Sequence, residues 1–377
     1  MRYRVPFNRL VGVNFMDLGR LAGEVTATTG VELTPRDVER VIASVARSSH
    51  FWEILGLARV PYPAAAETIR LLQDQGLVQV DGTGAILLTA EGQAFVKVHA
   101  LDPGQDFTCP GCGGRGLDLG KLKSGMQEFE ELAKGRPEAL LKYDQGHLTT
   151  ASVMARVALM AERGDLAGKR LLVLGDDDLL GLAAALTGLP QEVVVLEVDD
   201  RLVHYINDQA AKSGLPVKAH KYDFKDQLPD RWVKYFDTFN ADPPETLEAL
   251  KVCLTRGLCG LAGAGCAGYF GLTRTEASLK KWHLFQAMLL AEFKVAITDI
   301  IDNFNHYANW GYLLESIGDD YPFAQVAPKL NWFKSSMYRI EMVSGFEGVE
   351  NKPMSCELYL DEEALIYHPR NHGGTNG

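Results

Sequence analysis

Short apolar runs alternate with amphipathic stretches from about residue 126 onward. An uninterrupted apolar run predicts a strand buried on both faces, and apolar residues at helical spacing predict an amphipathic helix. The predicted strands span residues 169–175, 192–199, 217–223, 235–242, 266–273, 293–301 and 337–343, and the predicted helices span residues 151–163, 202–212, 245–258 and 276–292. This alternation predicts an α/β fold, doubly wound, with a mostly parallel sheet between two layers of helices.

The first 105 residues have a different pattern, in which helices are followed by a hairpin. Thr34 suits the N-cap of a helix, and Pro35 suits its first turn. A further helix over residues 65–75 precedes the alternating stretch 77–88, whose central Asp-Gly-Thr-Gly is a turn signal between two strands. This order predicts an N-terminal winged-helix-like domain over residues 1–105.

Winged helices often bind DNA through a basic recognition helix. The corresponding helix here, residues 68–75, sets one arginine, Arg70, against Asp74. We therefore expect a packing or dimerisation module. A winged-helix regulator with a degenerate sheet domain is a minor alternative.

The composition indicates which partners the chain favours. Its 377 residues include 38 lysines and arginines and 49 aspartates and glutamates, which give a formal net charge of −11. A negative field disfavours nucleic acid and favours cationic ligands. No charged-then-apolar leader opens the chain, and no apolar run reaches the roughly 18 residues that cross a bilayer. We expect a cytoplasmic protein that binds neither nucleic acid nor a membrane.

Two cysteines lie in a glycine-rich linker that we place at residues 106–125. Cys109 and Cys112 have the spacing of half a zinc site, and a structural zinc site needs four ligands. Two alternatives stay open, a turn without metal or a zinc site completed by distant ligands or a partner chain. In the catalytic site itself we predict no metal.

The rest of the chain divides into a catalytic domain over residues 126–355 and an acidic, partly flexible tail over residues 356–377. The acidic cluster at residues 361–363 is interpreted as a solvated turn or, alternatively, as a guide for cations. Residues from about 371 onward are polar and rich in glycine, and we expect them to be disordered.

Each of the four clearest strands ends in acidic residues. Ligands of open α/β sheets bind beyond the carboxyl ends of the strands, so these residues are expected to meet in one site. The four ends are Gly175-Asp176-Asp177-Asp178, Glu197-Val198-Asp199, Tyr222-Asp223-Phe224 and Asn240-Ala241-Asp242-Pro243-Pro244. Such a site repels phosphates and carboxylates and attracts cations.

Two of these carboxylates predict a nucleoside pocket. Glu197 lies 22 positions after Gly175, where a carboxylate usually binds ribose hydroxyls. Asp223 is a candidate acceptor for the exocyclic amine of adenine, with Phe224 as the stacking ring. The dinucleotide fingerprint G-x-G-x-x-G is absent and aspartates repel a pyrophosphate, which argues against NAD and FAD. We assign cofactor binding to Gly175, Asp176, Glu197, Asp199, Asp223 and Gln145.

The triple aspartate also predicts which nucleoside is bound. Ordinary methyltransferases place this turn near the methionine carboxylate of S-adenosylmethionine. Two unit charges 4 Å apart interact by about 4 kcal/mol at an effective dielectric constant of about 20. Decarboxylated S-adenosylmethionine instead presents a sulfonium and a free ammonium. We expect it as the co-substrate, with no permanently bound cofactor. A class-I S-adenosylmethionine-dependent amino-group methyltransferase is the alternative.

The loop after the fourth strand predicts the second substrate. Asp242-Pro243-Pro244 resembles the acidic-Pro-Pro motif of enzymes that transfer groups to amino nitrogens. A protonated polyamine must lose a proton before it attacks, and a carboxylate at the reacting nitrogen can relay that proton. The polar stretch 143–150 is expected to form the floor of the groove, and His147 in it is assigned no role as a base. We assign substrate binding to Asp178, Asp242, Pro243, Pro244 and Glu245.

With these residues in view, the chain resembles the branched-chain polyamine synthase family, aminopropyltransferases of thermophiles. The segments LLVLGDDDLLGLA, VVVLEVDDRLVHYIN, FNADPPET and LDEEAL carry the resemblance, which covers nearly the whole chain. It implies a Rossmann-like, methyltransferase-like sheet and two aminopropyl transfers from decarboxylated S-adenosylmethionine to the secondary amine of spermidine. The expected products are bis(aminopropyl)spermidine and methylthioadenosine, the expected partners are spermidine and related polyamines, and a homodimer is expected.

The resemblance also implies roles for single residues. Asp178 matches the single aspartate in the turn of linear spermidine synthases, so it is expected to handle the reacting amine while Asp177 assists. Glu197 and Asp223 match nucleoside contacts, and Asp242 with its two prolines matches the amine-side loop. The candidates are, for catalysis, Asp178, Asp177 and Asp242 and, near the sulfonium or amine, Gln145.

Overall fold

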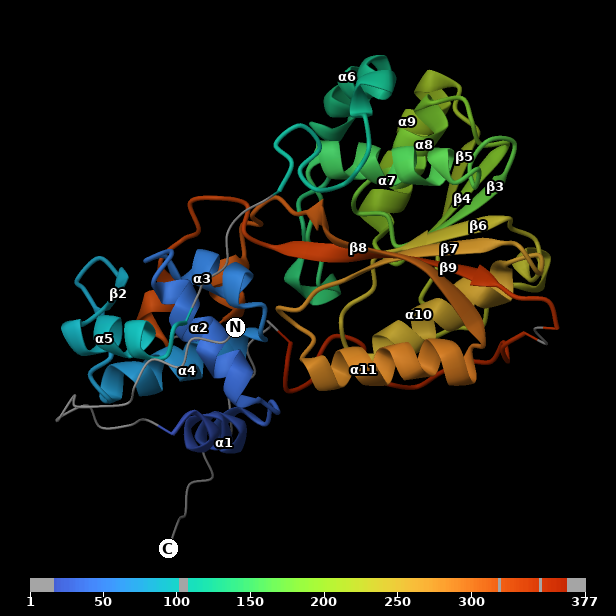
Figure 1. Cartoon of the computed structure of the whole chain (residues 1–377). Coiled ribbons are helices and arrows are strands. Elements are labelled where there is room, and N and C mark those ends of the chain that lie inside the picture. Colours follow the sequence, from blue (N-terminus) through green and yellow to red (C-terminus); the bar gives the residue numbers. More distant parts are fainter. Residues whose placement is uncertain (1–16, 102–107, 318–319, 346–347, 365–377) are drawn as a thin grey trace, which may run out of the picture.

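The computed structural model describes residues 17–101, 108–317, 320–345 and 348–364, and Figure 1 shows their arrangement. The disorder expected from residue 371 onward lies outside the described residues. Within the described ranges, every helix is too short or too polar to cross a bilayer.

A seven-stranded sheet forms the centre of the larger part of the molecule (Figure 1). Its spatial order is β5 (Val217–Lys221), β4 (Glu192–Glu197), β3 (Arg170–Leu174), β6 (Thr238–Ala241), β7 (Ala267–Leu272), β9 (Lys334–Met342) and β8 (Val295–His306). The first five strands are parallel, and β9 runs antiparallel to both of its neighbours. The prediction of an α/β fold with a mostly parallel sheet is confirmed.

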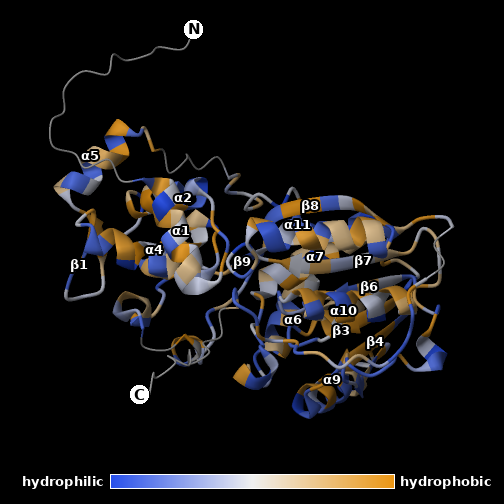
Figure 2. Ribbon diagram, turned by 90° about the horizontal axis from the view of Figure 1, so that it is seen from below, coloured by the Kyte–Doolittle hydropathy of each residue, from blue (hydrophilic) through white to orange (hydrophobic). Residues whose placement is uncertain are grey.

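Helices cover both faces of this sheet because its strands are apolar on both sides. In β3, Leu171 and Val173 point into one core, whereas Leu172 and Leu174 point into the other. The helices that pack on the two faces are amphipathic, which appears as mixed blue and orange ribbons in Figure 2. One face carries α6 (Lys123–Ala133), α7 (Thr150–Glu162), α8 (Leu180–Leu186) and α9 (Asp200–Ser213), and the other carries α10 (Leu247–Gly260) and α11 (Leu279–Ala287).

Two helices begin later than predicted, and both differences matter for the site. We expected helices from residues 245 and 276, but Thr246 caps α10 and Ser278 caps α11, each through its side-chain oxygen. Glu245 and Glu276 therefore lie in loops at the end of the sheet. The helix α8, directly after the triple aspartate, was not predicted.

The N-terminal part is a helical unit with a hairpin, as expected. It contains α1 (Leu18–Thr29), α2 (Pro35–Val45), α3 (Phe51–Ala58), α4 (Tyr62–Asp74), the antiparallel pair β1 (Val78–Val80) and β2 (Ile86–Leu88), and α5 (Ala90–Val98). Pro35 occupies the first turn of α2 after Thr34, as its position predicts. Shorter elements elsewhere are η1 (Leu119–Leu122), η2 (Leu141–Tyr143), η3 (Asp230–Trp232), η4 (Met288–Glu292), α12 (Leu313–Ser316) and η5 (Pro322–Gln325).

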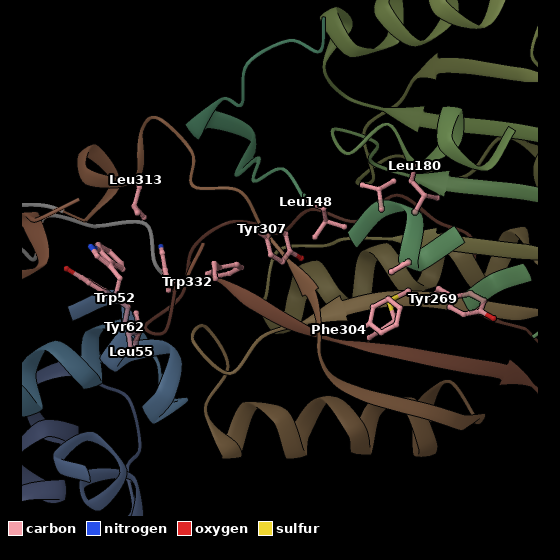
Figure 3. Packing of buried hydrophobic residues seen from close by; sticks show 14 of the residues in the cluster. Trp52, Leu55, Tyr62, Leu148, Leu180, Tyr269, Phe304, Tyr307, Leu313 and Trp332 are labelled. Atoms are coloured by element: carbon pink, nitrogen blue, oxygen red, sulfur yellow. The ribbon is translucent and has the colours of Figure 1, made fainter. Parts of the chain in front are cut away.

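Aromatic side chains join the helical unit to the sheet domain (Figure 3). The ring centroids of Trp52 on α3 and Trp332, which precedes β9, are 4.6 Å apart. The indole Nε1 of Trp52 donates to the carbonyl of Val326 at 2.9 Å. Trp332 in turn contacts Phe333, with ring centroids 5.2 Å apart. The helical unit therefore shares one apolar core with the sheet domain.

Candidate functional site

The carboxyl ends of β3, β4, β6 and β7 open into one cavity, as expected for this kind of sheet. The charged residues among its described lining are all anionic. Six carboxylates line it, from Asp144, Asp177, Glu197, Asp242, Glu245 and Glu276. Among the described lining residues there is no lysine or arginine. A cavity with this lining favours ligands that carry several positive charges.

Aromatic side chains form another part of the wall. Tyr307 and Trp310 each pack edge-on against Phe333, with centroids 5.0 Å and 5.4 Å apart. Tyr312 lies next to Trp310, with ring centroids 6.3 Å apart. Aromatic faces attract sulfonium and ammonium groups through their ring quadrupoles. The wall thus has the same charge preference as the carboxylates.

Glu197 is fixed at the end of β4. Its two carboxylate oxygens accept from the backbone N–H groups of Asp176 and Asp199, both at 2.8 Å. Burial raises the pKa of Glu197, and these two hydrogen bonds oppose the shift. Gly175 beside it has a φ of 70°, a left-handed conformation that glycine adopts without strain. Together they form a preorganised acceptor that can hold hydroxyl groups.

The three aspartates after Gly175 point in three directions. Asp176 is buried, and its carboxylate accepts from the N–H groups of Leu180 at 2.6 Å and Gly181 at 3.0 Å, at the start of α8. Asp177 is the member of the triplet that lines the cavity. Asp178 lies behind the wall, where it accepts from the N–H of Leu148 at 2.6 Å. The sequence placed all three at the ligand.

Burial raises the pKa of Asp177 well above its usual range, and the neighbouring Asp178, Glu197 and Asp242 raise it further. Burial also raises the pKa of Asp178 to about 6, although Arg156 opposes that shift. Both groups therefore titrate at a higher pH than ordinary aspartates.

Replacing Asp176 with alanine is expected to lower the free energy of unfolding by about 1–3 kcal/mol, because two buried N–H groups of α8 lose their acceptor. Chemical denaturation of the purified variant measures this. Asp177→Ala is the matched control, because Asp177 caps no helix. This variant should unfold at a denaturant concentration at least as high as that of the parent protein. Unchanged stability of Asp176→Ala together with lost nucleoside binding would contradict the capping role.

Asp242 follows β6, and hydrogen bonds from Arg156 and Tyr307 fix its carboxylate. Its Oδ1 accepts from Nη2 of Arg156 at 3.0 Å, and its Oδ2 accepts from the hydroxyl of Tyr307 at 2.7 Å. The side chain is 18% exposed and reaches the cavity, which Pro243 and Pro244 also line. The predicted acidic-Pro-Pro loop therefore does present its carboxylate to the ligand space.

A second group of carboxylates in the cavity consists of Asp144, Glu245 and Glu276. Burial raises the pKa of Asp144 well above its usual range, and the charge of Glu276 adds to the shift. Burial likewise raises the pKa of Glu245, with further contributions from Glu276, Asp242 and Asp144. Carboxylates that raise one another's pKa in this way favour a cationic ligand between them.

Of the residues predicted to bind the cofactor, Asp176, Asp199 and Asp223 lie outside the cavity lining. Asp199 caps α9 and receives hydrogen bonds from Arg201, and these lower its pKa although burial opposes them. Asp223 is 41% exposed and lies outside the lining, whereas its neighbour Phe224 lines the cavity. Gln145 lines the cavity, but its amide already donates to Asp199 at 3.3 Å.

Several residues that line or support the site were not predicted from the sequence. Glu276 follows β7, the fifth parallel strand, whose carboxyl end was not among the four strand ends used to predict the site. The rule that ligands bind beyond strand ends identifies Glu276 once β7 is included. Arg156 interrupts an apolar helix, a signal of a buried charge with a partner. Tyr307, Trp310 and Tyr359 come from segments with no distinctive pattern.

The sequence left two features open, the role of His147 and the state of Cys109 and Cys112. Burial, followed by Arg136 and Arg201, lowers the pKa of His147 to about 3, so it is uncharged at neutral pH. Cys109 and Cys112 are free thiols, and among the described residues no cluster of His, Cys, Asp or Glu has an arrangement that suits a metal ion.

The acidic cluster near the carboxyl end is not a solvated turn. Asp361 pairs with buried Lys281 at 2.7 Å, and Glu363 accepts from the N–H and hydroxyl of Ser278 at 2.6 and 2.7 Å. The interpretation as a solvated turn is wrong for these two residues, because a buried lysine and the start of α11 both need a counter-charge. The segment before them supplies Leu358 and Tyr359 to the cavity.

Known proteins are similar to this chain over most of its length. Residues 125–366 match the family model of the branched-chain polyamine synthase A C-terminal domain. The N(4)-bis(aminopropyl)spermidine synthase of Thermococcus kodakarensis is 40% identical over 90% of this chain and 97% of its own length. The synthase of Thermus thermophilus is 42% identical over 92% and 98%.

A solved structure is similar over the same range. The branched-chain polyamine synthase from Thermus thermophilus, in complex with N4-aminopropylspermidine and 5'-methylthioadenosine, superposes with a TM-score of 0.85 over 93% of this chain and 98% of that one. The family model covers more than half of the chain. The two relatives are at least 40% identical over at least 90% of it. The chain belongs to the branched-chain polyamine synthase family.

Proposed function

We propose that this protein transfers aminopropyl groups from decarboxylated S-adenosylmethionine to the secondary amine of spermidine, twice, giving bis(aminopropyl)spermidine and methylthioadenosine. The observation that carries the proposal is the cavity lined by six carboxylates and no lysine or arginine among the described residues. The names of the relatives, and the two ligands in the Thermus structure, support it. No permanently bound cofactor enters the proposal.

The end of the cavity at Gly175 and Glu197 is proposed to hold the nucleoside. Glu197 keeps lone pairs free for ribose hydroxyls, while its backbone hydrogen bonds prevent it from turning away. Phe224, whose ring edge lies within 3.6 Å of the position a Cβ on Gly175 would take, is the proposed stacking surface for the base. Asp176, Asp199 and Asp223 support this end from outside the lining.

Asp177 and Asp242 are proposed to face the reacting nitrogen. Asp177, with its raised pKa, takes the proton that the secondary ammonium must lose. Asp242, held by Tyr307, orients the amine toward the propyl carbon. The nitrogen lone pair then forms a bond to that carbon while the carbon–sulfur bond breaks, and its electron pair stays on sulfur, giving the neutral thioether.

The second transfer is chemically different from the first. The nucleophile is now a tertiary amine, and its attack leaves a quaternary nitrogen with a permanent positive charge and no proton to lose. Fixed carboxylates around this nitrogen stabilise the developing charge without reorganisation. The second group of carboxylates, Asp144, Glu245 and Glu276, is proposed to bind the primary ammonium groups of the polyamine arms.

Calorimetry with three nucleosides tests the proposed function. We expect decarboxylated S-adenosylmethionine to bind at least about 100-fold more tightly than S-adenosylmethionine, because the latter brings its carboxylate toward Asp177. Methylthioadenosine, which lacks both charged groups, serves as the reference, and each titration is repeated with spermidine. Turnover of S-adenosylmethionine into a methylated amine would identify a methyltransferase instead.

We further propose the domain division set out above for residues 1–105, 106–125, 126–355 and 356–377. The N-terminal unit is proposed to be winged-helix-like, because its helices lead into an antiparallel hairpin. Its proposed role is packing, through Trp52 and Trp332, rather than DNA binding. A homodimer is also proposed, and light scattering distinguishes it from a single chain of 41.5 kDa.

A further inference from the structure

Arg156 lies behind the cavity, in the middle of α7, and is fully buried. Its Nη2 donates to Oδ1 of Asp242 at 3.0 Å, and its Nε donates to the side-chain oxygen of Asn305 at 2.8 Å. Its Nη1 lies 3.8 Å from Oδ2 of Asp178 and makes no hydrogen bond to any described residue. One guanidinium thus joins two strand ends that are separate in the sequence.

Each of the two carboxylates is held on both sides. The other oxygen of Asp242 accepts from Tyr307, and the other oxygen of Asp178 accepts from the N–H of Leu148. Arg156 itself has no path to solvent. The three side chains form a rigid support that faces the proposed position of the amine.

We propose that Arg156 is a positioning residue for aminopropyl transfer, which fixes Asp242 at the reacting nitrogen and allows Asp178 and Asp242 to be negatively charged at the same time. The inference rests on the proposed function, because it concerns a group that supports the reacting amine and does not touch the substrate.

The charges around Asp178 explain why such a cation is needed. The groups that face it are the carboxylates of Asp176, Asp177 and Asp242 and the cations of Arg156 and Arg136. Carboxylates crowded in a buried site share protons unless a cation lies between them. Burial raises the pKa of Asp178 to about 6, and Arg156 is the main group that opposes this rise.

Gly271 lies beside Arg156 and Asp242 and shows how closely these two side chains are packed. A Cβ on Gly271 of β7 would lie 2.3 Å from Oδ1 of Asp242 and 3.3 Å from Nη2 of Arg156. An alanine there must displace the carboxylate, while it leaves every charge in place. Gly271→Ala therefore changes position without changing charge, and it complements substitutions of Arg156.

The test compares Arg156→Met, Arg156→Lys and Gly271→Ala by release of methylthioadenosine over a range of pH. We expect Arg156→Met to lower kcat about 100-fold and to move the acid limb of kcat/KM up by about one pH unit. Arg156→Lys restores the charge, so it should return the acid limb to its original position while kcat stays reduced. Gly271→Ala should lower kcat and leave the acid limb unchanged.

The affinity for methylthioadenosine is the internal control and should stay within about threefold in all three variants, because Glu197 is not touched. A parent protein that transfers no aminopropyl group refutes the proposed function itself. An active parent with an unshifted acid limb in Arg156→Met overturns the inference alone. If Arg156→Met does not fold, parental kcat in both Arg156→Lys and Gly271→Ala overturns it, and reduced kcat in both with unchanged acid limbs supports it.

Discussion

Replacing Asp177 with asparagine is expected to lower kcat/KM for aminopropyl transfer by about 1000-fold, which corresponds to about 4 kcal/mol of transition-state stabilisation. Asp177 is the member of the triplet that lines the cavity, and burial raises its pKa, which makes its carboxylate a stronger base. Asparagine preserves the shape of the side chain but takes up no proton. Release of methylthioadenosine, measured at limiting and saturating spermidine, gives kcat and KM separately.

Asp178→Asn is the informative control for this prediction. The sequence resemblance assigns the reacting amine to Asp178, whereas the structure places its carboxylate behind the wall, bonded to the N–H of Leu148. We expect this variant to lose roughly tenfold in kcat, through disturbed support of the wall. A loss of about 1000-fold in Asp178→Asn beside near-normal turnover in Asp177→Asn would restore the assignment made from the resemblance.

Acidification is expected to weaken polyamine binding steeply below about pH 6. Burial raises the pKa of Asp178 to about 6, and it raises the pKa values of Asp144, Asp177 and Glu245 well above the usual carboxyl range. Each proton taken up removes a negative charge from the cavity lining or, for Asp178, from the wall directly behind it. Methylthioadenosine carries no net charge, so its affinity should change much less, and calorimetry of both ligands at several pH values measures the contrast.

The stability of the empty protein should depend on pH in the opposite sense. A carboxyl group whose pKa is higher in the folded state than in the unfolded state stabilises the fold below its unfolded pKa, and this contribution is lost as pH rises through the folded pKa. For Asp178 that window runs from about 4 to about 6, and the loss is on the order of 1–3 kcal/mol.

Thermal unfolding checks this second effect. The Tm of the empty protein should fall between about pH 4 and pH 6, and saturating spermidine should remove that fall, because bound ammonium groups compensate the charged carboxylates. The variant Asp177→Asn should show a smaller fall than the parent protein. A Tm of the empty protein that rises throughout this range would show that the cavity carboxylates do not destabilise the fold when they become charged.

Much of the site could be predicted because the rule that creates it is local. Strand periodicity places Gly175, Glu197 and Asp242 at strand ends, and parallel strands bring those ends to one edge. The acidic character of that edge, and with it a cationic ligand, follows directly. The same rule would have found Glu276 if the end of β7 had been included.

The direction of each side chain could not be predicted in this way. Three consecutive aspartates are alike in the sequence, but after Gly175 the chain turns into α8, and the free N–H groups at its start donate to the first carboxylate. The second aspartate then faces the cavity and the third faces the interior. Asp199 was assigned to the ligand but caps α9 instead, for the same physical reason.

The sequence by itself determined the sheet, the helices on both faces and the sign of the charge at the site, because these depend on periodicity and on residue type. The tertiary structure decided which carboxylates reach the ligand. Only there do α7, β6 and the turn after β3 meet, so that Arg156 lies between Asp178 and Asp242. Only there do Trp52 and Trp332 bring the N-terminal unit against the aromatic wall. Contacts between residues far apart in the chain arise from packing, which no local pattern encodes.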